Sequence, residues 1–287
     1  MNDRSLDAQA APSKSAKRKW KDLGPRLISA FFMLAVTIFV VWAGGVWFAI
    51  LVAAAFAWVM REWMKMITRQ PLDIFGIVLM VLIAVISLTS AVVGIGGGAI
   101  AALLGLVVVL LGGAQNRAWR AGGFAFFSIV VISLVAIRGD TINGFIACFF
   151  LGTTIWMTDT GAFFSGRLFG GAKLSPEISP AKTWSGAIGG LVVGSLAGTL
   201  VWIVATPSPW WIGLAVAVAV SLIGQMGDLS ESAIKRHFRI KDSGGSIPGH
   251  GGLMDRLDSL TFGALLVFFV GAIHASPQLV ANGLLLW

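Results

Sequence analysis

The chain has 287 residues, of which 57% are hydrophobic and only 12% are charged, and its mean hydropathy is +0.87. This composition excludes an ordinary water-soluble domain and predicts an all-α polytopic membrane protein. The net charge of +8 does not indicate a nucleic-acid partner, because basic residues of membrane proteins gather in cytoplasmic loops.

The first segment, residues 1–24, is polar and rich in Lys, and we expect a disordered cytoplasmic tail. A membrane-spanning helix needs about 20 apolar residues. Nine stretches meet this requirement, and they lie near residues 25–43, 45–61, 73–93, 97–113, 121–138, 141–158, 185–205, 210–227 and 258–275.

The basic residues predict how these helices are oriented. If the tail is cytoplasmic and nine helices follow, all 21 Lys and Arg except Arg138 fall on the cytoplasmic side. The C-terminus then lies on the opposite side. Beyond the tail we expect a region of about six helices over 25–158 and a second region over 159–287. Two long polar loops of the second region, 159–184 and 228–257, should meet at the cytoplasmic boundary.

The second loop begins with a pattern that predicts a helix continuing from the eighth apolar stretch. One face of this helix carries Asp228, Glu231, Ser232, Lys235 and Arg236. Carboxylates bind a hard cation such as Mg²⁺, and Lys and Arg neutralise phosphate oxygens, so the face suits a metal-bound polyphosphate. Surface salt bridges between neighbouring turns are the alternative interpretation.

A glycine-rich segment over 243–252 follows Lys241 and Asp242, and such a segment lets the backbone approach a ligand closely. Beyond it come Asp255, Arg256 and Asp258. An acid at a helix N-terminus is stabilised by the helix dipole, which is the simpler interpretation of Asp258. Asp255 stands among apolar residues, where a carboxylate is costly unless it is paired or metal-bound.

The first loop carries Asp159 directly after an apolar stretch, and then Arg167. We expect residues 179–183 to open the seventh helix and to place Lys182 and Thr183 beside its free N–H groups, an arrangement suited to phosphate. Within that helix Gly190, Gly194 and Gly198 share one face, which predicts close helix packing.

Several of these segments together resemble the phosphatidate cytidylyltransferases, also called CDP-diacylglycerol synthases. The longest is S-A-I-K-R-H-F-R-I-K-D-S-G-G-S-I-P-G-H-G-G-L-M-D-R-L-D, from Ser232 to Asp258. The others are Gly227-Asp228 with Glu231-Ser232, D-T-G-A from Asp159, Gly166-Arg167, and S-P-A-K-T-W from Ser179. The sequence departs from the family pattern at Phe163, where Tyr is common, and at Ser185, where many members carry Glu.

This resemblance implies an enzyme of phospholipid biosynthesis that transfers a cytidylyl group from CTP to phosphatidic acid, with Mg²⁺ as cofactor. It implies that the second region is catalytic, with an active site facing the cytoplasm at a bacterial inner membrane, and it leaves open a second metal ion and a homodimer. Asp228 and Asp255 are the implied metal ligands, and Lys235 and Arg256 complete the implied catalytic set. The implied substrate-binding residues are Asp159, Arg167, Lys182, Thr183, Ser232, Arg236, Lys241, Asp242, His250 and Asp258.

Two other functions are compatible with a polytopic chain. A secondary transporter is disfavoured, because such proteins place charges near the membrane midplane and show repeated halves, and no repeat is visible here. A different CTP-using enzyme that acts on an isoprenoid or ether lipid is harder to separate, because acyl-chain grooves are lined by interchangeable apolar residues.

Overall fold

The computed structural model describes residues 35–112, 116–244 and 251–287, and the predicted tail and His250 lie outside them. Residues 35–43 are helical. The following elements are α3 (Gly45–Thr68), α4 (Ile74–Val92), α5 (Ile95–Leu111), α6 (Arg117–Arg138), α7 (Ile142–Phe169), β1 (Lys173–Ser175), β2 (Ser179–Thr183), α8 (Trp184–Ala205), α9 (Trp210–His237), α10 (Met254–His274), η1 (Pro277–Leu279) and α11 (Val280–Leu285).

The predicted apolar stretches correspond to helices throughout the described chain. Within the described residues, six helices are long and apolar enough to cross a membrane, namely α3, α4, α6, α8, α9 and α10. The outer faces are apolar as well: Leu103 and Leu104 of α5 and Leu196 and Leu200 of α8 are each more than 60% exposed. Such surfaces suit lipid and not water, so the chain is an α-helical multi-pass membrane protein. α5 is a shorter apolar helix and α7 is not among the six, so the count of nine stays a prediction.

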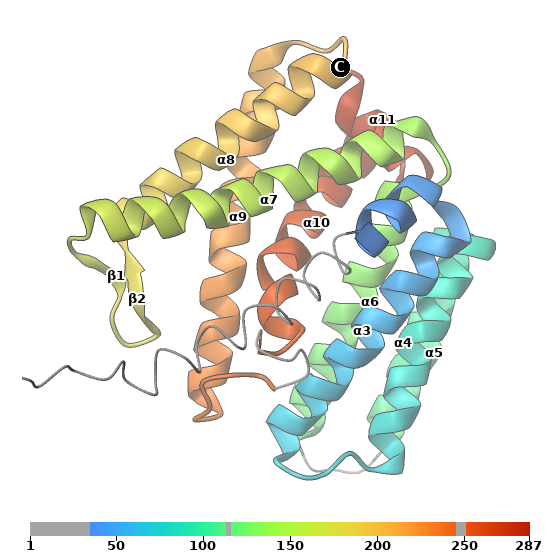
Figure 1. Cartoon of the computed structure of the whole chain (residues 1–287). Helices are drawn as coiled ribbons and strands as arrows, with labels where there is room; N and C mark the ends of the chain where they lie inside the picture. Colours follow the sequence, from blue (N-terminus) through green and yellow to red (C-terminus); the bar gives the residue numbers. More distant parts are fainter. Residues whose placement is uncertain (1–34, 113–115, 245–250) are drawn as a thin grey trace, which may run out of the picture.

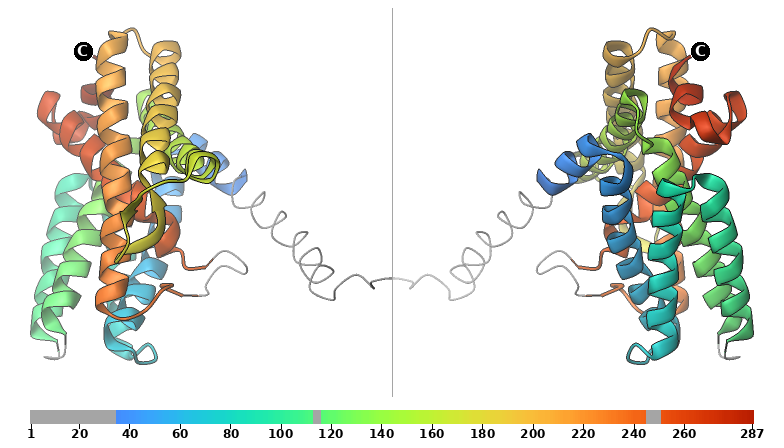
Figure 2. Two further views of the ribbon diagram at one scale, coloured as in Figure 1. Left: turned by 90° about the vertical axis from the view of Figure 1, so that its left-hand side faces the viewer. Right: turned by 90° about the vertical axis from the view of Figure 1, so that its right-hand side faces the viewer.

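Two groups of helices meet at α10. α3, α4, α5 and α6 pack together, while α7 packs along α8 and α8 against α9 (Figure 1). α10 contacts α9 on one side and α6 and α3 on the other. α7 crosses the molecule at a steep angle to α9 (Figure 1), and the side views show α8 and α9 running side by side (Figure 2). A polar residue near the start of α10 can therefore contact both groups.

The packing of α7 on α8 depends on the glycine face that the sequence predicts. A Cβ added at Gly190 would lie 2.7 Å from the carbonyl oxygen of Thr158, and one at Gly194 would lie 2.9 Å from that of Thr154. Real Cβ atoms rarely approach other atoms so closely, so these glycines allow the two backbones to come together. The predicted close packing is confirmed.

Gly194→Val should lower the free energy of unfolding by about 1–3 kcal/mol, because the new side chain has to push α7 away from α8. Gly152→Val is the matched control, since Gly152 lies within the partner helix α7 and a Cβ there meets nothing within 4 Å. Denaturant unfolding of both variants in detergent measures the difference. Equal stabilities would show that the contact is not tight.

The first polar loop is more ordered than the sequence suggests. α7 continues past the predicted end at 158 to Phe169, and it crosses the predicted boundary between the two regions without a break. The rest is an antiparallel hairpin in which Lys173 faces Thr183 and Ser175 faces Ser179. The expectation that residues 179–183 open the next helix is wrong. The Thr183 hydroxyl instead accepts a hydrogen bond from the Gly186 N–H at 3.1 Å, so Thr183 is the N-cap and α8 begins at Trp184.

Arg138, the one basic residue on the predicted outer side, is held by the backbone. Its side chain is buried and donates hydrogen bonds to the carbonyl oxygens of Val41, Trp42 and Thr141, at 2.5, 2.8 and 3.0 Å. A buried guanidinium is tolerable when its N–H groups are satisfied. These hydrogen bonds explain why a basic residue is tolerated on the predicted outer side.

Candidate active site

A polar cavity of about 640 Å³ lies where the two predicted polar loops converge. Its walls come from α7, the hairpin, the start of α8, α9 and α10. The predicted site residues that line it are Asp159, Arg167, Lys182, Thr183, Asp228, Lys235, Asp255, Arg256 and Asp258. The structure thus gathers most of the predicted set at one place, from segments almost 100 residues apart.

The hairpin is tied to α9 by an ion pair on the cavity wall. The ammonium of Lys182 lies 2.5 Å from Oδ2 of Asp228, and both side chains are about one-third exposed or less. Lys182 is held by the short strand β2, and Asp228 by the helical extension that the sequence predicts. The pair joins a predicted metal ligand to a predicted phosphate-binding cation.

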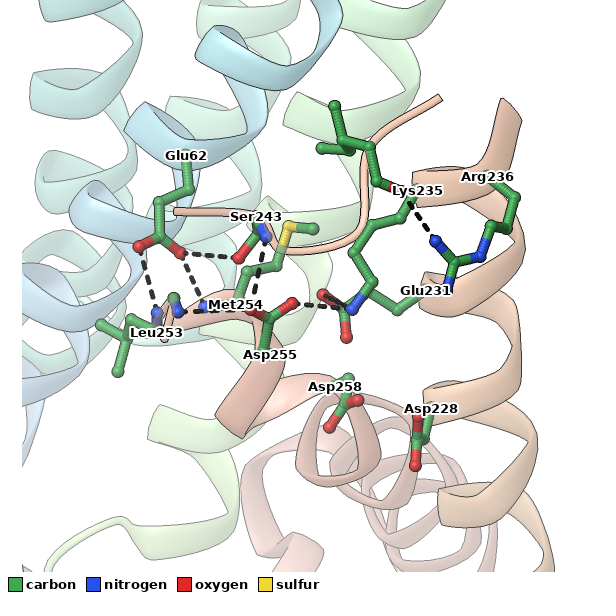
Figure 3. A network of polar contacts seen from close by, with 12 residues as sticks. Glu62, Asp228, Glu231, Lys235, Arg236, Ser243, Leu253, Met254, Asp255 and Asp258 are labelled. Atoms are coloured by element: carbon green, nitrogen blue, oxygen red, sulfur yellow. Dashed lines mark hydrogen bonds and ion pairs between the residues drawn. The ribbon is translucent and has the colours of Figure 1, made fainter. Parts of the chain in front are cut away.

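Asp255 is the centre of a second network, drawn in Figure 3. Its Oδ1 lies 2.7 Å from the ammonium of Lys235, while its Oδ2 accepts hydrogen bonds from the N–H groups of Gly252 and Ser243, at 3.2 and 3.3 Å. Two backbone donors and one cation hold the carboxylate in a single orientation. Asp255 is therefore paired, as the sequence analysis expects of a carboxylate among apolar residues.

Lys235 forms ion pairs with two carboxylates. Its ammonium also lies 3.4 Å from Oε1 of Glu231, one helical turn earlier on α9. Glu231 is buried and lines a separate apolar cavity of about 240 Å³ together with aromatic residues such as Trp63 and Phe127. A carboxylate in apolar surroundings is costly unless it is paired, and Lys235 is the cation that lies beside Glu231.

Glu62 is the residue of this network that the sequence analysis does not identify. It lies on α3, its side chain is buried, and its oxygens accept hydrogen bonds from the N–H groups of Leu253 and Met254, at 3.1 and 2.8 Å. The Ser243 hydroxyl donates a longer one, at 3.5 Å. Glu62 directly follows the apolar stretch 45–61 and is an acid between the basic residues Arg61 and Lys65, which is the sequence signal that could have revealed it.

The remaining predicted residues that the structure describes do not line the polar cavity. Ser232, Lys241 and Asp242 lie outside its walls, and Arg236 donates hydrogen bonds to the backbone oxygens of Ile178 and Ile240, both at 3.2 Å. Arg236 therefore fastens the end of α9 to the hairpin turn and to the loop that follows.

The two departures from the family pattern have different surroundings. Phe163 lines the cavity, and the Arg167 guanidinium lies 5.8 Å from its ring centroid. Ser185 donates a hydrogen bond to the carbonyl oxygen of Gly170 and lies 3.0 Å from the Thr183 hydroxyl. Its hydroxyl joins the end of α7 to the start of α8.

Asp228 and Asp255 fit a Mg²⁺ ion provided that a nucleotide and water supply its other ligands. Within residues 35–112, 116–244 and 251–287, no three His, Cys, Asp or Glu side chains form a group that could hold a metal ion. Mg²⁺ in nucleotide-using enzymes usually takes one or two carboxylates and completes its octahedron with water and phosphate oxygens. Asp228 and Asp255, on the walls of one cavity, suit a Mg²⁺ ion that is bound together with a nucleotide.

A cavity lined by acids and cations, between helices that span a membrane, defines a membrane protein that handles phosphate groups. The chain belongs to the cytidylyltransferase family, which it matches over residues 24–274. It is 37% identical over 264 residues to a phosphatidate cytidylyltransferase of Brucella abortus biovar 1 (strain 9-941), covering 91% of this chain and 97% of the relative. Enzymes of the same name from Bacillus subtilis (strain 168) and Staphylococcus aureus (strain COL) are 40% identical over 159 residues and 49% identical over 109 residues. These two matches cover 53% and 38% of this chain, and 59% and 42% of the relatives.

Proposed function

We propose that the protein is a phosphatidate cytidylyltransferase, which converts CTP and phosphatidic acid to CDP-diacylglycerol and pyrophosphate. The observation that carries the proposal is the convergence of the family's signature segments on one polar cavity, whose lining holds both acids and cations. The match to the Brucella abortus relative of that name covers 91% of the chain.

The reaction is a substitution at phosphorus. A phosphate oxygen of phosphatidic acid bonds to the α-phosphorus of CTP, the bond from that phosphorus to the bridging oxygen breaks, and pyrophosphate leaves. The attacking phosphate is already ionised near neutral pH, so no strong general base is needed. Catalysis then depends on holding the reactants in line and neutralising the charge on their phosphates.

Different cavity residues would bind the metal ion and neutralise the phosphate charge. Asp228 and Asp255 would hold Mg²⁺, which when bound draws negative charge from the nucleotide phosphates. Lys235 keeps Asp255 in place, and Arg167, Lys182 and Arg256 offer positive charge to the phosphates from the cavity walls. Ser232, Arg236, Lys241 and Asp242 are proposed as further substrate contacts outside that wall, and His250, which lies outside the described residues, is proposed as another substrate contact.

The proposal is tested by pyrophosphate release from the purified protein in mixed micelles with CTP, Mg²⁺ and phosphatidic acid. Matched samples lack each component in turn or contain ATP in place of CTP. Release should require all three components and fail with ATP. Release with an isoprenoid or ether lipid phosphate in place of phosphatidic acid would instead identify a related lipid enzyme, and no release with any lipid would contradict an enzymatic function.

We also propose that the site faces the cytoplasm at the cell membrane and that the C-terminus lies on the other side. The Ser208 hydroxyl donates a hydrogen bond to the carbonyl oxygen of Leu285 and accepts one from the N–H of Trp287, at 2.7 and 2.9 Å. The chain end is therefore anchored at the α8–α9 turn, where α9 begins, while the α9 residues that line the cavity, Gln225, Asp228 and Lys235, lie in the second half of that helix.

A reporter enzyme fused to the C-terminus should be active only outside the cytoplasm, because the basic loops around the site are retained inside. Alkaline phosphatase and green fluorescent protein fusions report the two sides separately. A fluorescent C-terminal fusion together with an inactive phosphatase fusion would contradict the proposed orientation and the odd number of helices.

A further inference from the structure

The start of α10 depends on a residue from another helix. The first N–H groups of a helix lack partners within the helix, and a polar side chain at the N-cap usually accepts a hydrogen bond from one of them. In α10 the N-cap is Leu253, whose side chain cannot accept a hydrogen bond. Glu62 of α3 takes that role, with its two oxygens on the N–H groups of Leu253 and Met254 (Figure 3).

This contact is well suited to carry a negative charge. The positive end of the α10 dipole and two backbone donors stabilise the buried Glu62 carboxylate, and charge-assisted hydrogen bonds are stronger than neutral ones. Glu62 is only 1% exposed, so the contact is shielded from water. A carboxylate in this position holds the first turn of α10 firmly on α3.

The turn that Glu62 holds is the one that carries Asp255. Asp255 follows Met254 directly, and its Oδ2 binds the N–H groups of Gly252 and Ser243. The Ser243 hydroxyl in turn donates a hydrogen bond to Glu62. Both carboxylates therefore bind Ser243 and neighbouring N–H groups of residues 252–254. A Cβ added at Gly252 would lie 3.0 Å from Oε2 of Glu62 and closer still to the Ser243 hydroxyl. Glycine is required there because Glu62 and Ser243 occupy the space of a side chain.

We propose that Glu62 is a positioning residue for Asp255: it caps α10 from α3, and through that cap the N-terminal helices set the place of the metal-binding carboxylate in the catalytic cavity. The proposal rests on the proposed function, in which Asp255 holds Mg²⁺. It gives the N-terminal helices a part in the reaction, because their contact with α10 fixes the backbone next to the donors that orient the carboxylate.

Three variants test this role. Glu62→Ala removes both acceptors, while Glu62→Gln keeps one acceptor oxygen and has an NH₂ group that cannot accept from the second N–H. Ser87→Ala is the control, because it removes the buried hydrogen bond that the Ser87 hydroxyl of α4 donates to the carbonyl oxygen of Ala49, near the other end of α3 from Glu62. If Glu62→Ala does not fold, Gly252→Ala disturbs the same contact from the other side.

The first measurement is hydrogen exchange of the segment 251–258, which needs no substrate. Exchange should be faster in Glu62→Ala than in the wild type, intermediate in Glu62→Gln and unchanged in Ser87→Ala. The second is the Mg²⁺ dependence of turnover, whose half-saturating concentration should rise about 10-fold or more in Glu62→Ala, since residues that orient metal ligands typically contribute 10- to 100-fold. A purely stabilising residue would not change that concentration.

The two measurements separate the inference from the function on which it rests. Wild-type exchange in a folded Glu62→Ala protein would overturn the capping role. Faster exchange with an unchanged Mg²⁺ dependence would overturn the link to Asp255. A wild-type protein that is inactive with CTP and phosphatidic acid would contradict the proposed function and leave the exchange result to decide the capping role alone.

Discussion

Asp255→Asn should lower turnover by about 1,000-fold while the protein stays folded in detergent. Asparagine keeps the shape of the side chain and one acceptor oxygen for the Gly252 and Ser243 N–H groups, but it loses the charge that would bind Mg²⁺. Losing one preorganised electrostatic contact at a reacting phosphate typically costs 100- to 1,000-fold, and a metal ligand stands at the upper end of this range. Pyrophosphate release at saturating CTP and Mg²⁺ measures the loss.

Folding should survive this change because Lys235 keeps its second partner, Glu231, 3.4 Å away. Size-exclusion chromatography and thermal unfolding in detergent check that the variant is intact. Asp140→Asn is the control, since Asp140 is an exposed carboxylate on the α6–α7 connection and does not line the cavity. Near-normal turnover of Asp255→Asn would remove the metal-ligand assignment.

The parts of this structure that follow from local sequence were predictable. A run of apolar residues long enough to span a bilayer has to become a helix, because lipid offers no partner for backbone groups. The spacing of Asp228, Glu231 and Lys235 also requires only a helix, and α9 continues to His237 as that spacing predicts. Charge bias alone placed the two polar loops on one side, and both contribute to one cavity.

The parts that depend on contacts between distant residues were not predictable. Glu62 binds the N–H groups of Leu253 and Met254, which are more than 190 residues away in the sequence. The residues next to Glu62 in the sequence do not indicate these partners. The extension of α7 beyond Asp159 packs against the start of α8, where a Cβ added at Gly186 would lie 2.9 Å from the carbonyl oxygen of Ala162. Thr183 could be identified as a site residue, but not as the cap that ends a strand and begins a helix.

Lys235→Met should reduce both stability and turnover, and a second substitution should separate the two losses. The Lys235 ammonium lies between Asp255 and Glu231, and all three side chains are less than one-fifth exposed. Removing the cation leaves two carboxylates facing each other in a poorly solvated place, and breaking a buried pair from one side costs about 3–5 kcal/mol. Turnover should fall about 100-fold or more, because Asp255 loses its orienting partner.

The double variant Lys235→Met with Glu231→Gln removes the cation together with one of its two anions. It should recover part of the lost unfolding free energy, since only Asp255 remains charged and two backbone N–H groups still bind it. Turnover should not recover, because neither substitution restores the cation beside Asp255. Denaturant unfolding and pyrophosphate release, measured on both single variants and the double variant, complete a double-mutant cycle. If turnover returns together with stability, Lys235 acts only by stabilising the fold; if stability does not return, the carboxylate pair is not what the lysine holds together.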